Sequence, residues 1–74
     1  MKKFKNYSEV TDHLKYRIDI LEGTYEGTYL FNDTWEILQF IPYIAIRAER
    51  GTYIYFLERI GDFKVYELKG RLKI

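Results

Sequence analysis

The sequence predicts one α+β domain, in which an N-terminal helix packs on a bent antiparallel meander of four or five strands. Apolar residues recur at helical spacing before Gly23, and runs rich in aromatic and β-branched residues, separated by turn residues, follow it. The chain has 74 residues, enough for a single domain that spans residues 1–74. Hydrophobic residues make up 47% of it, so we expect a packed core and not a disordered chain.

The predicted helix spans residues 6–21. Asn6 can cap its first turn, because Glu9 follows three residues later as in a capping box, and Ser8 is an alternative cap. One apolar stripe runs along this helix and consists of Val10, Leu14, Ile18 and Leu21. Gly23 then ends the helix.

Residues 24–31 and 35–41 are predicted to form a hairpin, joined by an Asn-Asp turn whose residues tolerate positive φ. A short helix is the alternative for the second segment, because Asp33 and Glu36 also fit a capping box. We favour the strand because Trp, Ile and Phe dominate this segment, and we expect Trp35 to anchor the core.

Pro42 cannot donate to a sheet ladder, so we expect a sharp bend there. A second hairpin is predicted from residues 43–48 and 52–60, with Gly51 at positive φ in a bulged three-residue loop. A two-residue turn then leads into a strand at 63–69, which a glycine ends before a short edge segment.

Strand alternation sorts these side chains onto two faces. The predicted turns pair Ile46 with Ile54 and Glu58 with Val65. The aliphatic face is expected to pack against the helix and holds Ile44, Ile46, Ala48, Ile54, Phe56, Ile60, Phe63 and Val65. The opposite face is aromatic and basic and holds Tyr43, Ala45, Arg47, Tyr53, Tyr55, Leu57, Arg59, Lys64, Tyr66 and Leu68. We predict a common core of Leu14, Ile18, Ile46, Ile54 and Phe56.

The residue types argue against an enzyme, and we expect no cofactor and no metal. Cysteine is absent, which excludes disulfides and thiolate ligands. His13 is the only histidine, and no serine or further ligand is placed to complete a triad or a zinc site. Glu58 and Glu67 on neighbouring strands could act as an acid–base pair if one were buried, but solvated strand residues are the simpler interpretation.

Aromatic residues make up 19% of the chain, and eight tyrosines are too many for so small a core. Some must therefore line a contact surface, since Tyr and Arg concentrate at the centres of interfaces. The predicted partner-binding residues are Tyr43, Arg47, Tyr53, Tyr55, Arg59, Lys64 and Tyr66. Two alternatives use the same residues: they stack the bases of a single-stranded nucleic acid, or they form the inner wall of a partial barrel.

The expected function is that of a small protein-binding module that inhibits or modulates another protein, with self-association as a variant. The composition, short, cysteine-free and tyrosine-rich, is typical of accessory or inhibitor proteins of phages and other mobile elements. Nucleic acid is the less favoured partner because the formal net charge is only +1. No apolar run of about 18 residues and no signal peptide are evident, so we expect no membrane partner and a cytoplasmic location.

Overall fold

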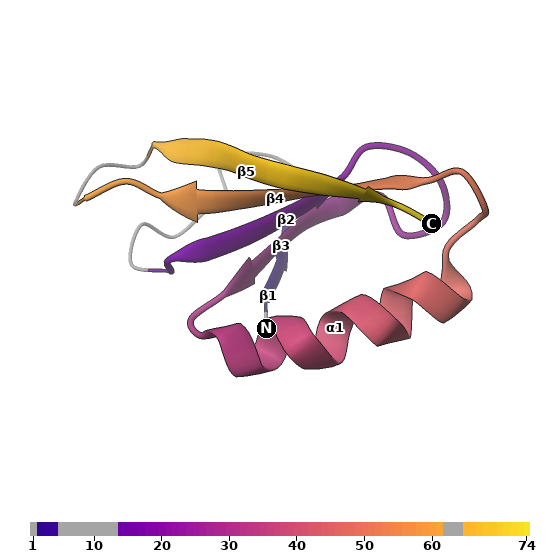
Figure 1. The fold of residues 1–74 in the computed structure, drawn as a ribbon, viewed down its shortest axis with the longest axis horizontal. Coiled ribbons are helices and arrows are strands. Elements are labelled where there is room, and N and C mark those ends of the chain that lie inside the picture. Colours follow the sequence, from indigo (N-terminus) through magenta and orange to yellow (C-terminus); the bar gives the residue numbers. More distant parts are fainter. Residues whose placement is uncertain (1, 5–13, 62–64) are drawn as a thin grey trace.

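The computed structural model describes residues 2–4, 14–61 and 65–74, which form one antiparallel sheet and one helix (Figure 1). In chain order the elements are β1 (Lys2–Phe4), β2 (Tyr16–Ile20), β3 (Gly27–Phe31), α1 (Thr34–Arg47), β4 (Tyr53–Arg59) and β5 (Tyr66–Lys73). The sheet order is β1-β3-β2-β4-β5, and every neighbouring pair is antiparallel. The predicted α+β class and the antiparallel sheet are therefore confirmed.

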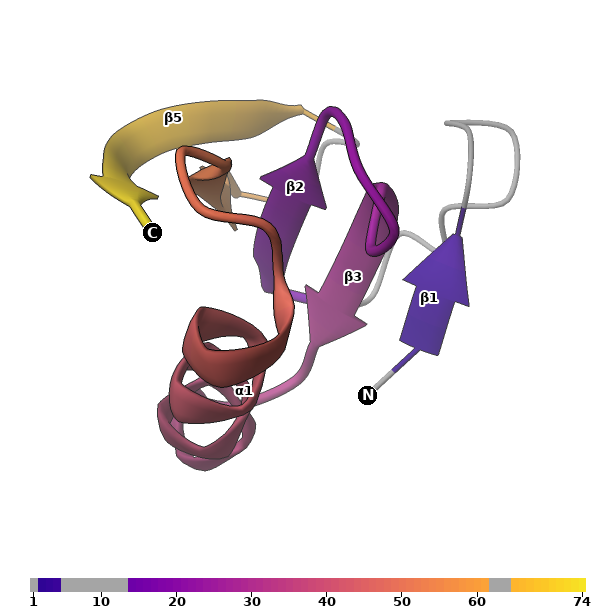
Figure 2. The ribbon, with the colours of Figure 1, turned by 90° about the vertical axis from the view of Figure 1, so that its right-hand side faces the viewer.

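The order of the strands is not that of a simple meander. β2 and β3 form one hairpin and β4 and β5 another, while α1 carries the chain from β3 past β2 to β4 (Figures 1 and 2). α1 covers one face of the sheet, and in the described part of the chain no helix covers the other face. The described strands form an open sheet with β1 and β5 at its edges, so closure into a barrel is not confirmed.

The helix lies where two strands were predicted, at residues 35–41 and 43–48, so both strands are wrong there and the capping-box alternative is correct. The Asp33 side chain accepts a hydrogen bond from the Glu36 backbone N–H at 3.1 Å, which satisfies an N–H that the first helical turn leaves without a partner. Pro42 lies inside α1 and does not bend the chain out of it. Apolar residues lie on two sides of this segment, next to the core and facing away from it, which hid its helical period.

The N-terminal helix predicted at 6–21 is wrong at its C-terminal end, which is strand β2; residues 6–13 lie outside the described part of the chain. Ile18 and Ile20 are fully buried two residues apart, as in a strand, whereas Leu21, expected on the buried stripe, is 64% exposed. Ile18 fits both the helical spacing with Leu14 and Leu21 and the strand alternation with Ile20. Pairing on both sides of β2 selects the strand.

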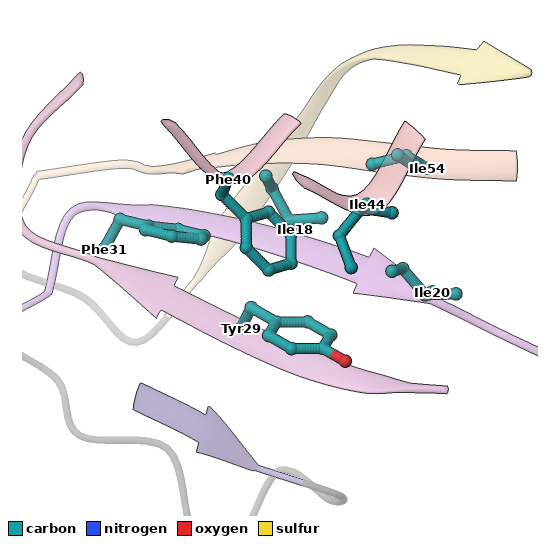
Figure 3. Close-up of a cluster of buried hydrophobic side chains, with 7 residues drawn as sticks. All are labelled: Ile18, Ile20, Tyr29, Phe31, Phe40, Ile44 and Ile54. Atoms are coloured by element: carbon teal, nitrogen blue, oxygen red, sulfur yellow. The ribbon is translucent and has the colours of Figure 1, made fainter. Parts of the chain in front are cut away.

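The core lies between α1 and the covered face of the sheet (Figure 3). Phe40 lies with its ring centre 4.7 Å from that of Tyr29 and 5.2 Å from that of Phe31. The whole cluster comprises Ile18, Ile20, Tyr29, Phe31, Phe40, Ile44 and Ile54. Of the predicted core, Leu14, Ile18 and Ile54 are buried and Phe56 packs at the margin of the cluster. Ile46 is 81% exposed and was wrongly placed in the core, because α1 turns it away from the sheet.

Gly51 has a φ of 91°, as predicted, but it connects α1 to β4 and does not close a hairpin. The β4–β5 register pairs Glu58 with Glu67, two residues away from the predicted pairing of Glu58 with Val65. The register shifts between Phe56 and Leu57, so the offset from the predicted pairing is two residues at Glu58 and three at Tyr53 and Tyr55. The predicted sorting of β4 side chains survives because Ile54 still faces the core and its neighbours alternate with it. β5 also continues through Gly70, beyond the predicted end of the strand.

Candidate protein-binding surface

Four of the seven predicted site residues share the sheet face that α1 leaves uncovered. Ile54 is buried beneath α1, so the alternating residues of β4 lie on the opposite side of the sheet, and their β5 partners lie there with them. This outer sheet face comprises Tyr53, Tyr55, Leu57, Arg59, Tyr66, Leu68, Arg71 and Lys73. Tyr43 and Arg47 are not part of it, because both lie on α1. Lys64 and His13 lie outside the described residues.

The centre of the outer sheet face is a pair of tyrosines flanked by cations. The rings of Tyr53 and Tyr55 are 6.2 Å apart and both side chains are half-buried. The Arg71 guanidinium carbon lies 4.8 Å from the centre of the Tyr53 ring, and Lys73 Nζ lies 5.9 Å from it. Cations over an aromatic face are attracted by the ring quadrupole, which holds both charges at the surface beside the rings.

A hollow of about 230 Å³ lies beside this pair, lined by Leu21, Glu22, Tyr53 and Tyr55. It is smaller than the roughly 300–1,000 Å³ of most small-molecule sites. The hollow suits a single inserted side chain better than a cofactor.

A buried charge lies beside the outer sheet face, on β2, where Arg17 and Asp19 stand opposite Leu57 and Tyr55 in register. Arg17 is only 3% exposed, and its Nε donates to Asp19 Oδ1 at 2.9 Å while Nη2 bonds the second carboxylate oxygen. Thr28 Oγ1 also donates to Asp19 Oδ1, at 3.0 Å. The Arg17 guanidinium carbon lies 5.2 Å from the Tyr66 ring centre, and the Tyr66 hydroxyl donates to the Leu14 carbonyl at 2.7 Å. Tyr66 therefore fastens β5 to the start of β2, a structural role that the sequence did not indicate.

Two cations of this surface were missed by the sequence analysis. Arg71 and Lys73 were left in a short edge segment because Gly70 was taken as the end of the strand. Their alternation with Gly70 and Leu72 was the signal that could have extended it. In the structure they stand opposite Tyr55 and Tyr53 in register.

Tyr43 and Arg47 form a separate pair on α1. The Arg47 guanidinium carbon lies 3.9 Å from the Tyr43 ring centre, and Nη1 donates to the Tyr43 carbonyl at 3.1 Å. Trp35, expected in the core, is 71% exposed on the same helix. These residues cannot contact a ligand on the outer sheet face, because the sheet lies between.

The carboxylates weighed for acid–base chemistry take part in solvated ion pairs. Glu58 and Glu67 stand opposite one another in register, but Lys15 Nζ lies 3.8 Å from Glu58 and Lys69 Nζ lies 3.0 Å from Glu67. The hydrogen bond from Lys69 to Glu67 raises the pKa of the Lys69 ammonium. The Glu58 and Glu67 side chains are 38% and 54% exposed, so neither has the burial that the acid–base interpretation requires.

Among the residues with described positions, no three His, Cys, Asp or Glu side chains are grouped to hold a metal ion. The only helix in the described segments falls short of the length and apolarity needed to cross a membrane. Comparison with protein-family models, with curated proteins and with solved structures gives no match.

Proposed function

We propose that this protein is a small non-enzymatic binding module that holds an acidic protein partner against the outer sheet face and thereby inhibits or modulates it. One observation carries the proposal: the sheet face that α1 does not cover presents two adjacent tyrosines with two cations over one of their rings. Tyr and Arg are the residues that most often supply the binding energy of an interface, because each combines a large contact area with a polar end.

The geometry favours a partner with carboxylates around an apolar side chain. Leu57 and Leu68 stand opposite one another in register between the tyrosine pair and Tyr66, and Leu68 is 57% exposed. The described contacts of Arg71 and Lys73 are with an aromatic ring, which leaves their charge to attract an anion. An apolar centre with a cationic rim is the usual anatomy of a protein interface.

A single-stranded nucleic acid is the second candidate, favoured by the spacing of the tyrosines. Tyr53 and Tyr55 are two residues apart on one strand, so both rings project from the same side of the sheet. Successive bases can stack on such rings while the cations on the neighbouring strand neutralise phosphates.

Capture from lysate of the native host, with and without nuclease, separates the two candidates. A protein partner stays bound after nuclease treatment, and its affinity changes little with salt. If the captured material disappears with nuclease, a direct titration of labelled single-stranded oligonucleotide follows. Nucleic-acid binding then shows a steep linear fall of log affinity with log salt concentration, which contradicts the protein-binding proposal.

A further inference from the structure

The helix α1 is apolar on two opposite sides. One side contributes Phe40 and Ile44 to the core, where they are 5% and 0% exposed. The opposite side presents an outer stripe, defined as Trp35, Leu38, Pro42 and Ile46. Steps of three and four residues place these four on one face of an α-helix. Three of them are among the most exposed large side chains described: Trp35 at 71%, Leu38 at 60% and Ile46 at 81%.

Nothing in the core requires apolar residues on the outer stripe. A folded monomer rarely leaves a continuous apolar patch in water. The outer stripe is therefore the kind of surface that a second molecule covers.

The charges around the outer stripe identify that molecule. The stripe itself carries no charge, whereas Asp33 caps the N-terminal end of α1 and Arg47 and Arg50 lie at or just beyond its C-terminal end. The nearby Glu49 carboxylate is turned to the other side, where it accepts the Thr24 backbone N–H at 3.0 Å. One end of the surface is thus acidic and the other basic.

We propose that the outer stripe pairs with the same stripe of a second copy, with the two α1 helices antiparallel about a two-fold axis. An antiparallel pair brings the acidic end of each helix beside the basic end of the other, at both ends at once. In that arrangement Trp35 faces Ile46 of the second copy and Leu38 faces Pro42. A parallel pair would instead place like charges together, which disfavours it.

The dimer is expected to be weak and dependent on concentration. α1 has 14 residues and is therefore about 21 Å long, which limits the area that two such helices can bury. Interfaces below about 1,200 Å² belong to the weak and transient class, so association in the micromolar range follows. The two outer sheet faces point away from the two-fold axis, so the dimer leaves both free. This inference does not depend on the proposed function.

The chain contains one tryptophan, Trp35, which reports on the interface directly. Sedimentation velocity from low to high micromolar concentration should show conversion of monomer to dimer, with a blue shift of tryptophan emission over the same range. Ile46→Glu should raise the dimer dissociation constant by at least ~10-fold, because it places a carboxylate in the apolar centre. Arg47→Glu with Arg50→Glu should weaken the dimer as well, while Tyr55→Ala on the outer sheet face should leave it unchanged.

Circular dichroism confirms that each variant is folded, and Leu38→Ala replaces Ile46→Glu if the latter does not fold. A monomer at the highest concentration would overturn the proposal, as would a dimer that survives both Ile46→Glu and Leu38→Ala. A monomer whose emission shifts to the blue only on anionic phospholipid vesicles would also overturn it, in favour of a membrane surface. The acidic end of the helix argues against that outcome.

Discussion

Two isoleucines on α1 test the orientation of the helix against the sheet. Ile44 is completely buried in the core cluster, and Ile46, two positions further on, is 81% exposed. The same substitution at the two positions, Ile44→Ala and Ile46→Ala, changes the same atoms in the same helix. Only the packing environment differs between them.

The expected magnitudes follow from the burial. Removing three buried carbons from Ile44 loses about 2.5 kcal/mol of transfer free energy at ~0.8 kcal/mol per carbon, and the cavity left behind adds to this loss. At Ile46 only about a fifth of the side chain is shielded, so the loss is about 0.5 kcal/mol. A domain of this size has roughly 3–5 kcal/mol of net stability, so Ile44→Ala should unfold a measurable fraction at room temperature.

Urea unfolding followed by far-ultraviolet circular dichroism measures both free energies. The protein is kept dilute, because a dimer would add a concentration-dependent term to the stability of the wild type and of Ile44→Ala. Equal losses for the two variants, or a larger loss for Ile46→Ala in dilute solution, would show that α1 does not turn Ile44 toward the sheet.

Three further predictions concern the backbone, a buried charge and a titrating tyrosine. Gly51 and Gly70 both have open space where a Cβ would lie, but only Gly51 is at positive φ. Gly51→Ala should therefore cost about 1–2 kcal/mol of stability in thermal melts, and Gly70→Ala almost nothing. Equal shifts of the melting temperature would contradict this backbone explanation. Asp19→Ala removes the carboxylate that accepts two hydrogen bonds from the buried Arg17 guanidinium and should cost about 3 kcal/mol in urea melts. Much of this loss should be recovered in the double variant with Arg17→Met, and no recovery would show that the ion pair itself is stabilising. Burial first, and then the nearby Tyr25 and Tyr43, raise the pKa of the Tyr29 phenol, so the folded form binds its proton more tightly than the unfolded form. Stability should therefore decline as pH rises past about 10, and Tyr29→Phe should decline less steeply in unfolding midpoints measured against pH, whereas parallel curves would contradict the assignment.

The sheet was predictable where one pattern dominates, and the helix was not. In β4 apolar Ile54 alternates with polar-ended Tyr53 and Tyr55, and the strand was predicted within one residue of its true ends. In α1 apolar residues lie on two sides of the helix, so the segment matches both strand and helix, and the preference of Trp, Ile and Phe for strands misled the choice. The capping box at Asp33 was the better signal, because it depends on one local hydrogen bond and not on burial.

The prediction of a helix at residues 6–21 was wrong at its C-terminal end for a different reason. Leu14, Ile18 and Leu21 have helical spacing, but Ile18 and Ile20 have strand spacing, and the sequence alone does not say which set faces the core. β2 becomes a strand because β3 and β4 pair with it on both sides. Such pairing is a tertiary effect, which local preferences do not record.

The candidate surface was predicted in part for a similar reason. The face assigned to β4 is correct because alternation along the strand places Tyr53 and Tyr55 opposite the buried Ile54, whichever residues of β5 pair with them. Tyr43 and Arg47 were lost from it when their segment proved to be helical, and Arg71 and Lys73 were gained when β5 proved longer. The buried Arg17 could not be foreseen, since its burial depends on the pairing of three strands.

The claim that the outer sheet face binds the partner is tested most directly by comparing two tyrosines, one on each side of the sheet. Tyr55 lies on the outer sheet face opposite Arg71, and Tyr43 lies on α1 beneath Arg47, on the other side of the sheet. The measurement is the affinity of the captured partner for folded Tyr55→Ala and folded Tyr43→Ala, each relative to the wild type, by isothermal titration calorimetry. If the outer sheet face is the binding surface, Tyr55→Ala costs about 2 kcal/mol or more of binding free energy, roughly a 30-fold loss of affinity. Tyr43→Ala then binds as the wild type does. Unchanged affinity for Tyr55→Ala, or a loss confined to Tyr43→Ala, would contradict this claim and show that the outer sheet face is not the binding surface.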